Sequence, residues 1–321
     1  MSRNKNSLQF ELFKRASEGL KGNTTRKQYK YACKKFASWC KEQGIKQIEK
    51  VDKDLIQKYS NHLQEDPFKF SAGTIHTYLA PICKACGVNM RDINKPRRKS
   101  NTIIKGRQEA ENPFGKLQET SPEFKRLITL QKAVGIRRNE LENLKREDFI
   151  KREYGIYYVH VRKGKGGKET FQMILPKDVP IVKNIFEEVP TGHNVFSKDE
   201  MNNKINLHAL RREHANDVYQ FFENIILTVN GFARSLRERL IKMFERGNYD
   251  LYKANPQKYE AKLKRFIDDM NDTPYELRGE NKKRAIQNGK PVIYNRLALM
   301  AVSVLALSHW RLDVTVVNYI V

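Results

Sequence analysis

The chain has 321 residues, enough for two domains of ordinary size, and its 61 Lys and Arg against 37 Asp and Glu give a formal net charge of +24. An excess of this size calls for a polyanionic partner or a very soluble surface, and nucleic acid is the commonest such partner. No apolar run approaches the roughly 20 residues that span a bilayer, and the N-terminus lacks the apolar region of a secretory signal. These properties argue against a membrane protein and favour a cytoplasmic one.

Residues 7–95 have the pattern of three or four short amphipathic helices. The clearest apolar stripe has helical spacing and consists of Tyr29, Cys33, Phe36 and Cys40. Asp52 and Ser71 are suited to cap the starts of two later helices. The aromatic side chains on these stripes are expected in a core, which leaves Lys and Arg on the opposite faces as candidates for phosphate contact.

The four cysteines give little support for a metal site. Cys83 and Cys86 form a CxxC motif, but Cys33 and Cys40 are seven apart and do not supply the second close pair that a zinc site needs. Buried thiols on helix faces are therefore expected, with no bound metal.

A basic linker is predicted at residues 96–110. The stretch 95–108 holds six basic and no acidic residues, has no helical period, and is punctuated by Pro96 and Gly106. An isolated run of this kind would be a solvated surface segment. Since this one joins two basic regions, we expect it to run along the DNA and to contact it. The contacting residues would be Arg97, Arg98, Lys99, Lys105 and Arg107.

The pattern changes after the linker. Helical segments lead to two alternating strands, "GIYYVHVR" and "ETFQMILP", which the glycine turn "KGKGG" joins into a β-hairpin. Helix returns over 181–219, a highly charged helical stretch covers about 222–290, and the chain closes with an apolar helix, a polar corner and a short final helix. The expected fold class is mainly α with a small β-hairpin or sheet (α+β).

Several short motifs could carry chemistry, and each alone has an ordinary structural reading. The arginine of "GIRRNEL" could pair with Glu140 on the surface, and the helix start "HALRR" could face solvent. The "GKGGK" stretch is not a nucleotide P-loop, because Arg162 stands where the first glycine is needed and Glu169 follows Lys168. Tyr319 in "LSHWRLDVTVVNYIV" could be a core aromatic of the last helix.

Taken in order, these motifs resemble the tyrosine recombinases, the phage-integrase family. The resemblance covers most of residues 112–321, and the stretch "SAGTIHTYLAPI" is closest to the family's small core-binding domain. The implied organisation is a helical core-binding domain at 1–95, the linker at 96–110, and a catalytic domain at 111–321 that contains a helical insertion at about 222–290.

The resemblance implies six catalytic residues, which are Arg137, Lys165, His208, Arg211, His309 and Tyr319. Two arginines suit an anionic phosphodiester because the guanidinium donates paired hydrogen bonds and stays charged. The histidines can donate hydrogen bonds or handle protons, and a hairpin lysine can protonate the leaving oxygen. The tyrosine is the implied nucleophile, Glu140 would orient Arg137, and Trp310 would pack over the site or share the role of the histidine.

Three departures from the family pattern stand out. Ser308 replaces the usual glycine before the histidine. The interval from Arg211 to His309 is 98 residues, several times the usual gap, and the extra segment is expected either to decorate the domain or to contact DNA or a neighbouring protomer. Only two residues follow Tyr319, so inter-subunit contacts lie elsewhere or the chain is a shortened piece, and delivery of the tyrosine in cis or in trans is left open.

The implied function is a site-specific DNA recombinase or integrase that cuts and rejoins strands through a 3′-phosphotyrosyl intermediate. It would integrate or excise a bacterial mobile element, without cofactor or metal, as a tetramer that passes through a Holliday junction on duplex DNA, and could require a directionality factor. Two alternatives remain. One is a type IB topoisomerase-like enzyme, and the other is a non-catalytic DNA-binding protein on the same scaffold.

Overall fold

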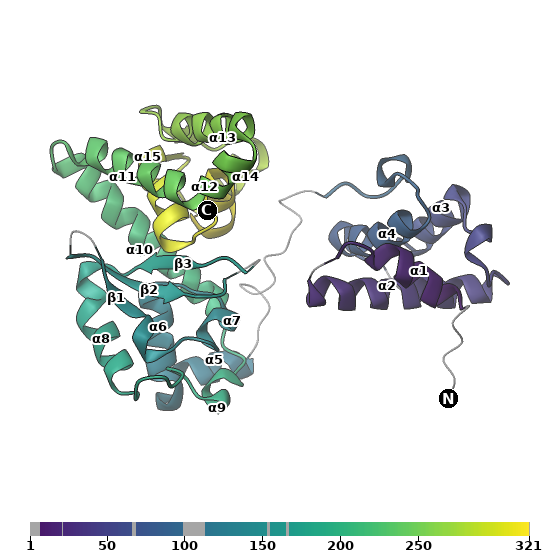
Figure 1. Ribbon diagram of the computed structural model, residues 1–321, viewed down its shortest axis with the longest axis horizontal. Coiled ribbons are helices and arrows are strands. Elements are labelled where there is room, and N and C mark those ends of the chain that lie inside the picture. Colours follow the sequence, from purple (N-terminus) through teal and green to yellow (C-terminus); the bar gives the residue numbers. More distant parts are fainter. Residues whose placement is uncertain are drawn as a thin grey trace. The chain divides into compact units, whose positions relative to one another are not determined.

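The computed structural model describes residues 7–20, 22–65, 69–98, 113–152, 155–164 and 167–320. The chain divides into two compact units, Met1–Ile103 and Ile104–Val321 (Figure 1). Four residues singled out in the sequence lie outside the described residues, and these are Lys99, Lys105, Arg107 and Lys165.

Unit 1 is a small helical domain. Its four helices are α1 (Leu8–Ser17), α2 (Asn23–Glu42), α3 (Lys53–His62) and α4 (Ala72–Ala85). The two predicted caps are confirmed: the Asp52 carboxylate accepts the Leu55 N–H at 2.8 Å, and the Ser71 hydroxyl accepts the Thr74 N–H at 3.2 Å. Helix α2 begins at Asn23 behind Gly22, which offers no side-chain cap.

The core of unit 1 consists of the predicted apolar stripes. Phe36 is fully buried and packs edge-on against Tyr59, with ring centroids 4.8 Å apart. Cys33 and Cys40 are buried as well, and burial raises the pKa of each thiol to about 12. These thiols are therefore protonated core side chains at neutral pH.

Unit 2 begins around a three-stranded antiparallel sheet. Its strands are β1 (Phe149–Lys151), β2 (Tyr157–Val161) and β3 (Thr170–Met173), in the order β1-β2-β3. The predicted hairpin of β2 and β3 is confirmed, whereas β1 was not foreseen from the sequence. The first helices are α5 (Pro113–Thr120), α6 (Lys125–Val134), α7 (Arg138–Leu141), α8 (Val179–Glu187), α9 (Lys198–Met201) and α10 (Leu207–Thr228).

Both faces of this sheet are covered, because successive side chains of a strand point to opposite faces. Val159 and Val161 pack in one core with α6 and α8. Tyr158 and Met173 pack in a second core with the C-terminal helices. The hairpin therefore connects the two halves of unit 2.

The second half is helical apart from a two-stranded ribbon. It contains α11 (Phe232–Gly247), α12 (Tyr249–Ala254), α13 (Pro256–Asp268), β4 (Tyr275–Glu276), α14 (Gly279–Gln287), β5 (Ile293–Tyr294), α15 (Arg296–Ala301), a π-helical turn at Val302–Ala306, α16 (Leu312–Thr315) and a second π-helical turn at Val316–Ile320. Helix α10 runs unbroken past residue 222 to Thr228, so the first residues of the expected insertion belong to α10.

We call residues 229–294 the linking module, because they connect α10 to α15. Leu236, Phe244 and Phe266 of the module belong to the same buried cluster as the side chains of α15 and as Tyr319. In Figure 1 the yellow C-terminal turns lie among the green helices of the module. The fold class prediction, mainly α with a small β element, is confirmed. No described helix combines the length and hydropathy needed to cross a membrane.

Candidate active site

Tyr319 lies at the centre of a cluster of predicted site residues. Its side chain is buried in the last π-helical turn, and its ring centroid is 5.4 Å from that of His208 and 5.7 Å from that of His309. The guanidinium carbon of Arg211 lies 5.6 Å from the same ring. Four residues that the sequence spreads over more than a hundred positions therefore meet within one chain.

Arg211 is the buried cation of this cluster. Only 1% of its surface is exposed, and its guanidinium donates to the carbonyl oxygens of Gly135 and, at 2.9 Å, of Leu307. Burial lowers the pKa of Arg211, and the charge of Arg137 lowers it further, while Tyr319 raises it through its charge and a side-chain hydrogen bond. A buried guanidinium held in this way forms a fixed positive centre beside the phenol.

The carbonyl that anchors Arg211 is provided by a glycine at a helix end. Gly135 follows α6 with φ +57°, the left-handed conformation common at helix C-termini. A Cβ at this position would lie 2.5 Å from Cδ2 of His214, so the close packing of α6 and α10 also requires glycine. His214 is buried, its Nδ1 contacts the Lys132 carbonyl oxygen, and burial lowers its pKa to about 4.

Arg137 is held by Glu140 at the start of α7. The Glu140 carboxylate is buried and accepts both the backbone N–H of Arg137, at 2.8 Å, and its Nη1, at 2.7 Å. The hairpin passes close by, since a Cβ on Gly164 would lie 3.4 Å from Oε1 of Glu140. The charge of Arg137 contributes to the lowered pKa of both Arg211 and His309, which places it beside the same cluster.

His309 lies in a strained corner. Its neighbours Ser308 and Trp310 have φ values of +52° and +59°, which side chains with a Cβ rarely adopt. The Ser303 carbonyl oxygen accepts the N–H of His309 at 3.1 Å and that of Trp310 at 3.4 Å. Burial and the charges of nearby arginines lower the pKa of His309 to about 3, so its imidazole is neutral at physiological pH.

The hydroxyl of Ser303 sets the orientation of the His309 ring. It accepts the N–H of Arg311 at 2.7 Å and lies 3.3 Å from Nδ1 of His309. A serine hydroxyl that accepts one N–H can still donate its own proton, and donation to Nδ1 would leave the ring hydrogen on Nε2. Nε2 is buried and has no hydrogen-bond partner among the described residues, so it is a donor available to a ligand.

Two buried glutamines support the site and were missed from the sequence. Gln131 in α6 donates to the Ile136 carbonyl at 2.8 Å and to the Leu207 carbonyl at 2.7 Å. These two bonds hold the residue before Arg137 next to the first residue of α10. Gln172 in β3 donates to the hydroxyl of Ser308. In the sequence, each glutamine could have been recognised as a single polar residue at a position where the apolar pattern predicts burial.

The other predicted residues have mixed positions. Arg97 and Arg98 are exposed, and Arg98 donates to the Gly73 carbonyl oxygen at 3.1 Å. The ring of Trp310 lies 5.6 Å from that of Phe266 in the linking module. No group of three or more metal-ligating side chains occurs in the described part of the chain.

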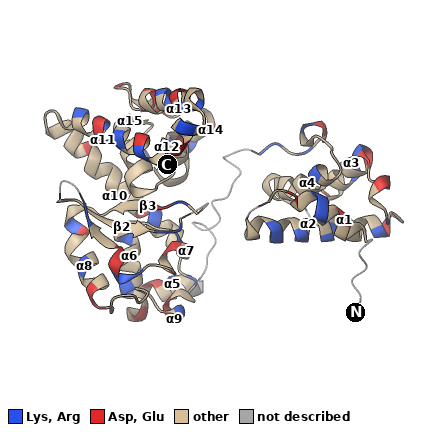
Figure 2. Ribbon diagram, in the orientation of Figure 1, with Lys and Arg blue, Asp and Glu red and all other residues tan. Residues whose placement is uncertain are grey.

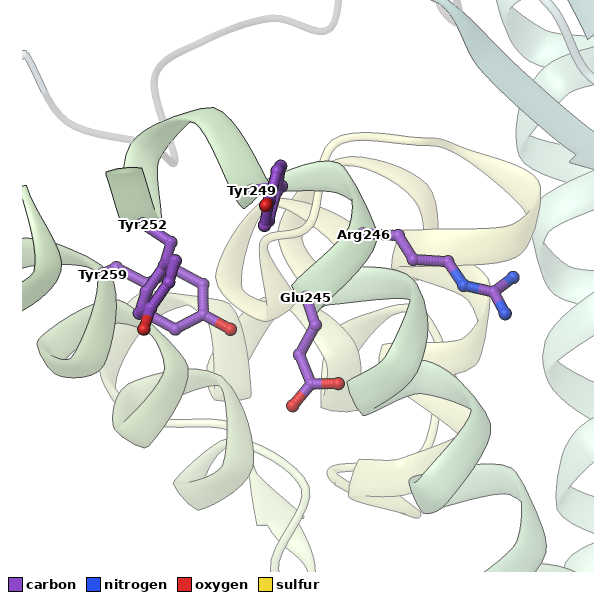
Figure 3. A pocket seen from close by; sticks show the side chains of 5 residues that line it. All are labelled: Glu245, Arg246, Tyr249, Tyr252 and Tyr259. Atoms are coloured by element: carbon purple, nitrogen blue, oxygen red, sulfur yellow. The ribbon is translucent and has the colours of Figure 1, made fainter. Parts of the chain in front are cut away.

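A cavity of about 510 Å³ lies apart from this cluster, on the linking module (Figure 3). It is lined by Glu245, Arg246, Tyr249, Tyr252 and Tyr259. The rings of Tyr252 and Tyr259 lie together, whereas the guanidinium of Arg246 points away from them. None of the six predicted catalytic residues contributes to its lining.

Comparison with known proteins supports the family resemblance in unit 1. Residues 9–93, which make up most of unit 1, match the phage integrase SAM-like domain. This match supports recognition of the chain as a tyrosine recombinase.

One solved structure, that of the XerA recombinase, is similar at 16% sequence identity and a TM-score of 0.24, over 66% of this chain and 83% of that one. The search of curated proteins found no match.

Proposed function

We propose that the chain is a tyrosine-dependent, site-specific DNA recombinase that integrates or excises a mobile element. The observation that carries this proposal is the meeting of Tyr319 with Arg211, His208 and His309 inside one chain. A phenol is ionised to only about one part in a thousand at neutral pH, so a tyrosine becomes a useful nucleophile beside fixed cations.

In the proposed reaction the phosphodiester binds between Arg137 and Arg211. The phenol oxygen of Tyr319 attacks phosphorus, the bond from phosphorus to the 5′-oxygen breaks, and the phenol proton passes to His208. The Nε2–H of His309 and the guanidinium groups donate to the non-bridging oxygens as their charge grows. Lys165, on the hairpin, protonates the departing 5′-oxygen.

The product of this step is a 3′-phosphotyrosyl bond and a free 5′-hydroxyl. Because the phosphoester is conserved, a second 5′-hydroxyl can reverse the attack and join a new strand without a cofactor. Exchange of both strands in this way needs four protomers and a Holliday junction, and we propose such a tetramer on a specific duplex site in the bacterial cytoplasm. A directionality factor would choose between integration and excision.

The surface charge of unit 1 supports contact with duplex DNA. The exposed face of α2 is basic (Figure 2), and its exposed cations are Arg26, Lys27, Lys30, Lys34, Lys35 and Lys41. Glu42 is the one acidic residue of that helix. Such a row neutralises backbone phosphates without reading sequence, so binding should weaken steeply with salt.

A suicide substrate tests the proposal. A nicked duplex that loses a short fragment after cleavage traps the covalent adduct, which is seen as a shifted band after denaturing electrophoresis. Wild-type protein should form the adduct, and Tyr319→Phe should form none while binding DNA equally well. Relaxation of supercoiled DNA without joining of two sites would favour a topoisomerase, and tight binding without adduct would favour a non-catalytic binder.

A further inference from the structure

The linking module contacts two of the segments that carry candidate catalytic residues, the corner at His309 and the helical turn at Tyr319. The first contact is aromatic. Phe244 of α11 and Phe266 of α13 stack with ring centroids 4.8 Å apart, and Trp310 packs against both, at 6.1 and 5.6 Å. Trp310 directly follows His309, so the module packs against the strained corner.

The second contact is polar. Arg284 of α14 donates to the Val317 carbonyl oxygen at 3.5 Å, and Lys290 donates to the Ile320 carbonyl oxygen at 3.3 Å. Cations near the last carbonyl groups of a helix satisfy acceptors that lack intrahelical partners and complement the negative end of the helix. Both acceptors flank Tyr319 in its π-helical turn.

We propose that the linking module is a brace for the active site. Phe244 and Phe266 position the corner that carries His309, and Arg284 and Lys290 position the helical turn that carries Tyr319. These four are positioning residues, since they act through the catalytic groups and touch no substrate. The proposal rests on the proposed function and assigns a purpose to the long interval between Arg211 and His309.

The local conformation explains why a brace is needed. Left-handed φ values at Ser308 and Trp310, and a π-helical turn at Tyr319, are sparsely populated conformations that persist only where the surroundings fix them. α10 fixes one side, because Asn216 donates to the Tyr319 carbonyl oxygen at 2.9 Å. The module fixes the other side.

A module that only covered the surface of the domain would not need contacts to the His309 corner and to the turn that carries Tyr319. The charge of Arg284 also contributes to the lowered pKa of Arg212 on α10. The Arg284 guanidinium therefore lies where the module meets both α10 and the π-helical turn Val316–Ile320, which we call the terminal turn. Arg239 of α11 donates to the hydroxyl of Tyr158 in β2, which joins the module to the sheet as well.

The test compares two double variants of equal charge. R284A/K290A removes both polar contacts to the terminal turn. The control K282A/K283A removes two cations of α14 whose partners are Glu276 and Glu280. Each is measured for adduct formation in a single turnover at saturating DNA. We expect R284A/K290A to react roughly ten- to a hundredfold more slowly, as for small misplacements of a reacting group, and K282A/K283A to react at the wild-type rate.

Amide hydrogen exchange gives a readout that does not depend on activity. Exchange at residues 312–320 should accelerate in R284A/K290A and stay unchanged in K282A/K283A, while α10 and the sheet keep their protection. The conservative R284K/K290R variant keeps the charges and donors and should restore both rate and protection.

The outcomes separate the brace from the proposed function. Wild-type rate and exchange in R284A/K290A, or equal slowing of both double variants, would overturn the brace. If wild-type protein forms no adduct, the proposed function fails, and the exchange data still decide whether the module holds the terminal turn.

The aromatic contact has its own test. Trp39→Phe leaves Trp310 as the single tryptophan, so its emission reports on the corner. In that background, Phe266→Leu should shift the emission to longer wavelength and slow adduct formation. Unchanged emission and rate would contradict a positioning role for this ring.

Discussion

The ring of Tyr319 lies 5.6 Å from Cζ of Arg211, and both side chains are buried in one chain. The terminal turn therefore reaches the arginine pocket of its own chain in this structure. Because Arg211 is tied to the Gly135 and Leu307 carbonyl oxygens, it presents its remaining donors in a fixed direction. The proposed chemistry would thus depend on the geometry of the guanidinium as well as its charge.

Arg211→Lys should separate charge from geometry. Lysine keeps the positive charge but cannot bridge two carbonyl groups while facing a phosphate, so adduct formation should fall by roughly a hundredfold or more. Single-turnover cleavage of the suicide substrate measures this. Arg311→Lys is the control, because Arg311 is exposed and paired with Asp313. Activity of Arg211→Lys within a few-fold of wild type would contradict the assignment.

Ser303→Ala should disturb the tautomer of His309. Without the hydroxyl, Nδ1 loses the hydrogen bond that favours hydrogen on Nε2, and the rate should fall by up to roughly a hundredfold, the cost of one lost donor. Long-range nitrogen–proton NMR correlations of the imidazole read the tautomer directly. A slower variant whose His309 keeps the wild-type tautomer would reject this cause.

Gly135→Ala should cost stability through two effects. The left-handed φ costs about 1 kcal/mol for alanine, and the new Cβ would meet His214, which adds about 1–3 kcal/mol. Gly231→Ala is the matched control, since Gly231 has φ +76° and open space around its Cβ position. Urea unfolding should show a larger loss for Gly135→Ala, and equal losses would rule out the clash.

Acid should destabilise unit 2 through His214. Its folded pKa of about 4 lies below the ordinary value of 6.5, so the unfolded state binds the proton first. Stability should therefore decline as pH falls from about 6.5 to about 4, by on the order of 3 kcal/mol. Urea unfolding at several pH values measures this decline, which should be shallower in His214→Gln. His309, with a pKa of about 3, adds a loss of the same sign.

Local features of the fold could be predicted from the sequence. The apolar stripes, the caps Asp52 and Ser71, and the β2–β3 hairpin depend on residues close together in the chain. Strand β1 escaped prediction because it has three residues and pairs only through β2. Helix α7 has four residues, Arg138–Leu141, and too short a pattern to delimit.

The motifs also distinguished two adjacent arginines that the structure uses differently. Arg137 pairs with Glu140 beside the tyrosine cluster. Arg138 instead donates to the Met201 and Ile205 carbonyl oxygens and to Asn203, which fixes the segment before α10. Composition and periodicity alone treat the two residues as equal, so the family pattern was needed to separate them.

Contacts between distant segments could not be predicted. The positive φ at Ser308 and Trp310 has no signal in residues that carry a Cβ, and it follows from the hydrogen bonds of Ser303. The pairing of Gln172 with Ser308 joins residues 136 positions apart. Likewise, the position of Arg284 at the terminal turn depends on how α14 folds back.

The common core of the linking module and the C-terminal helices has a consequence for protein engineering. Leu236, Phe244 and Phe266 lie in one buried cluster with the side chains of α15 and with Tyr319, so we expect these segments to unfold together. Excising the module would leave an apolar surface in the core that holds Tyr319. A chimera should accordingly exchange everything from the start of α10 onward, since the module and the tyrosine share one buried core.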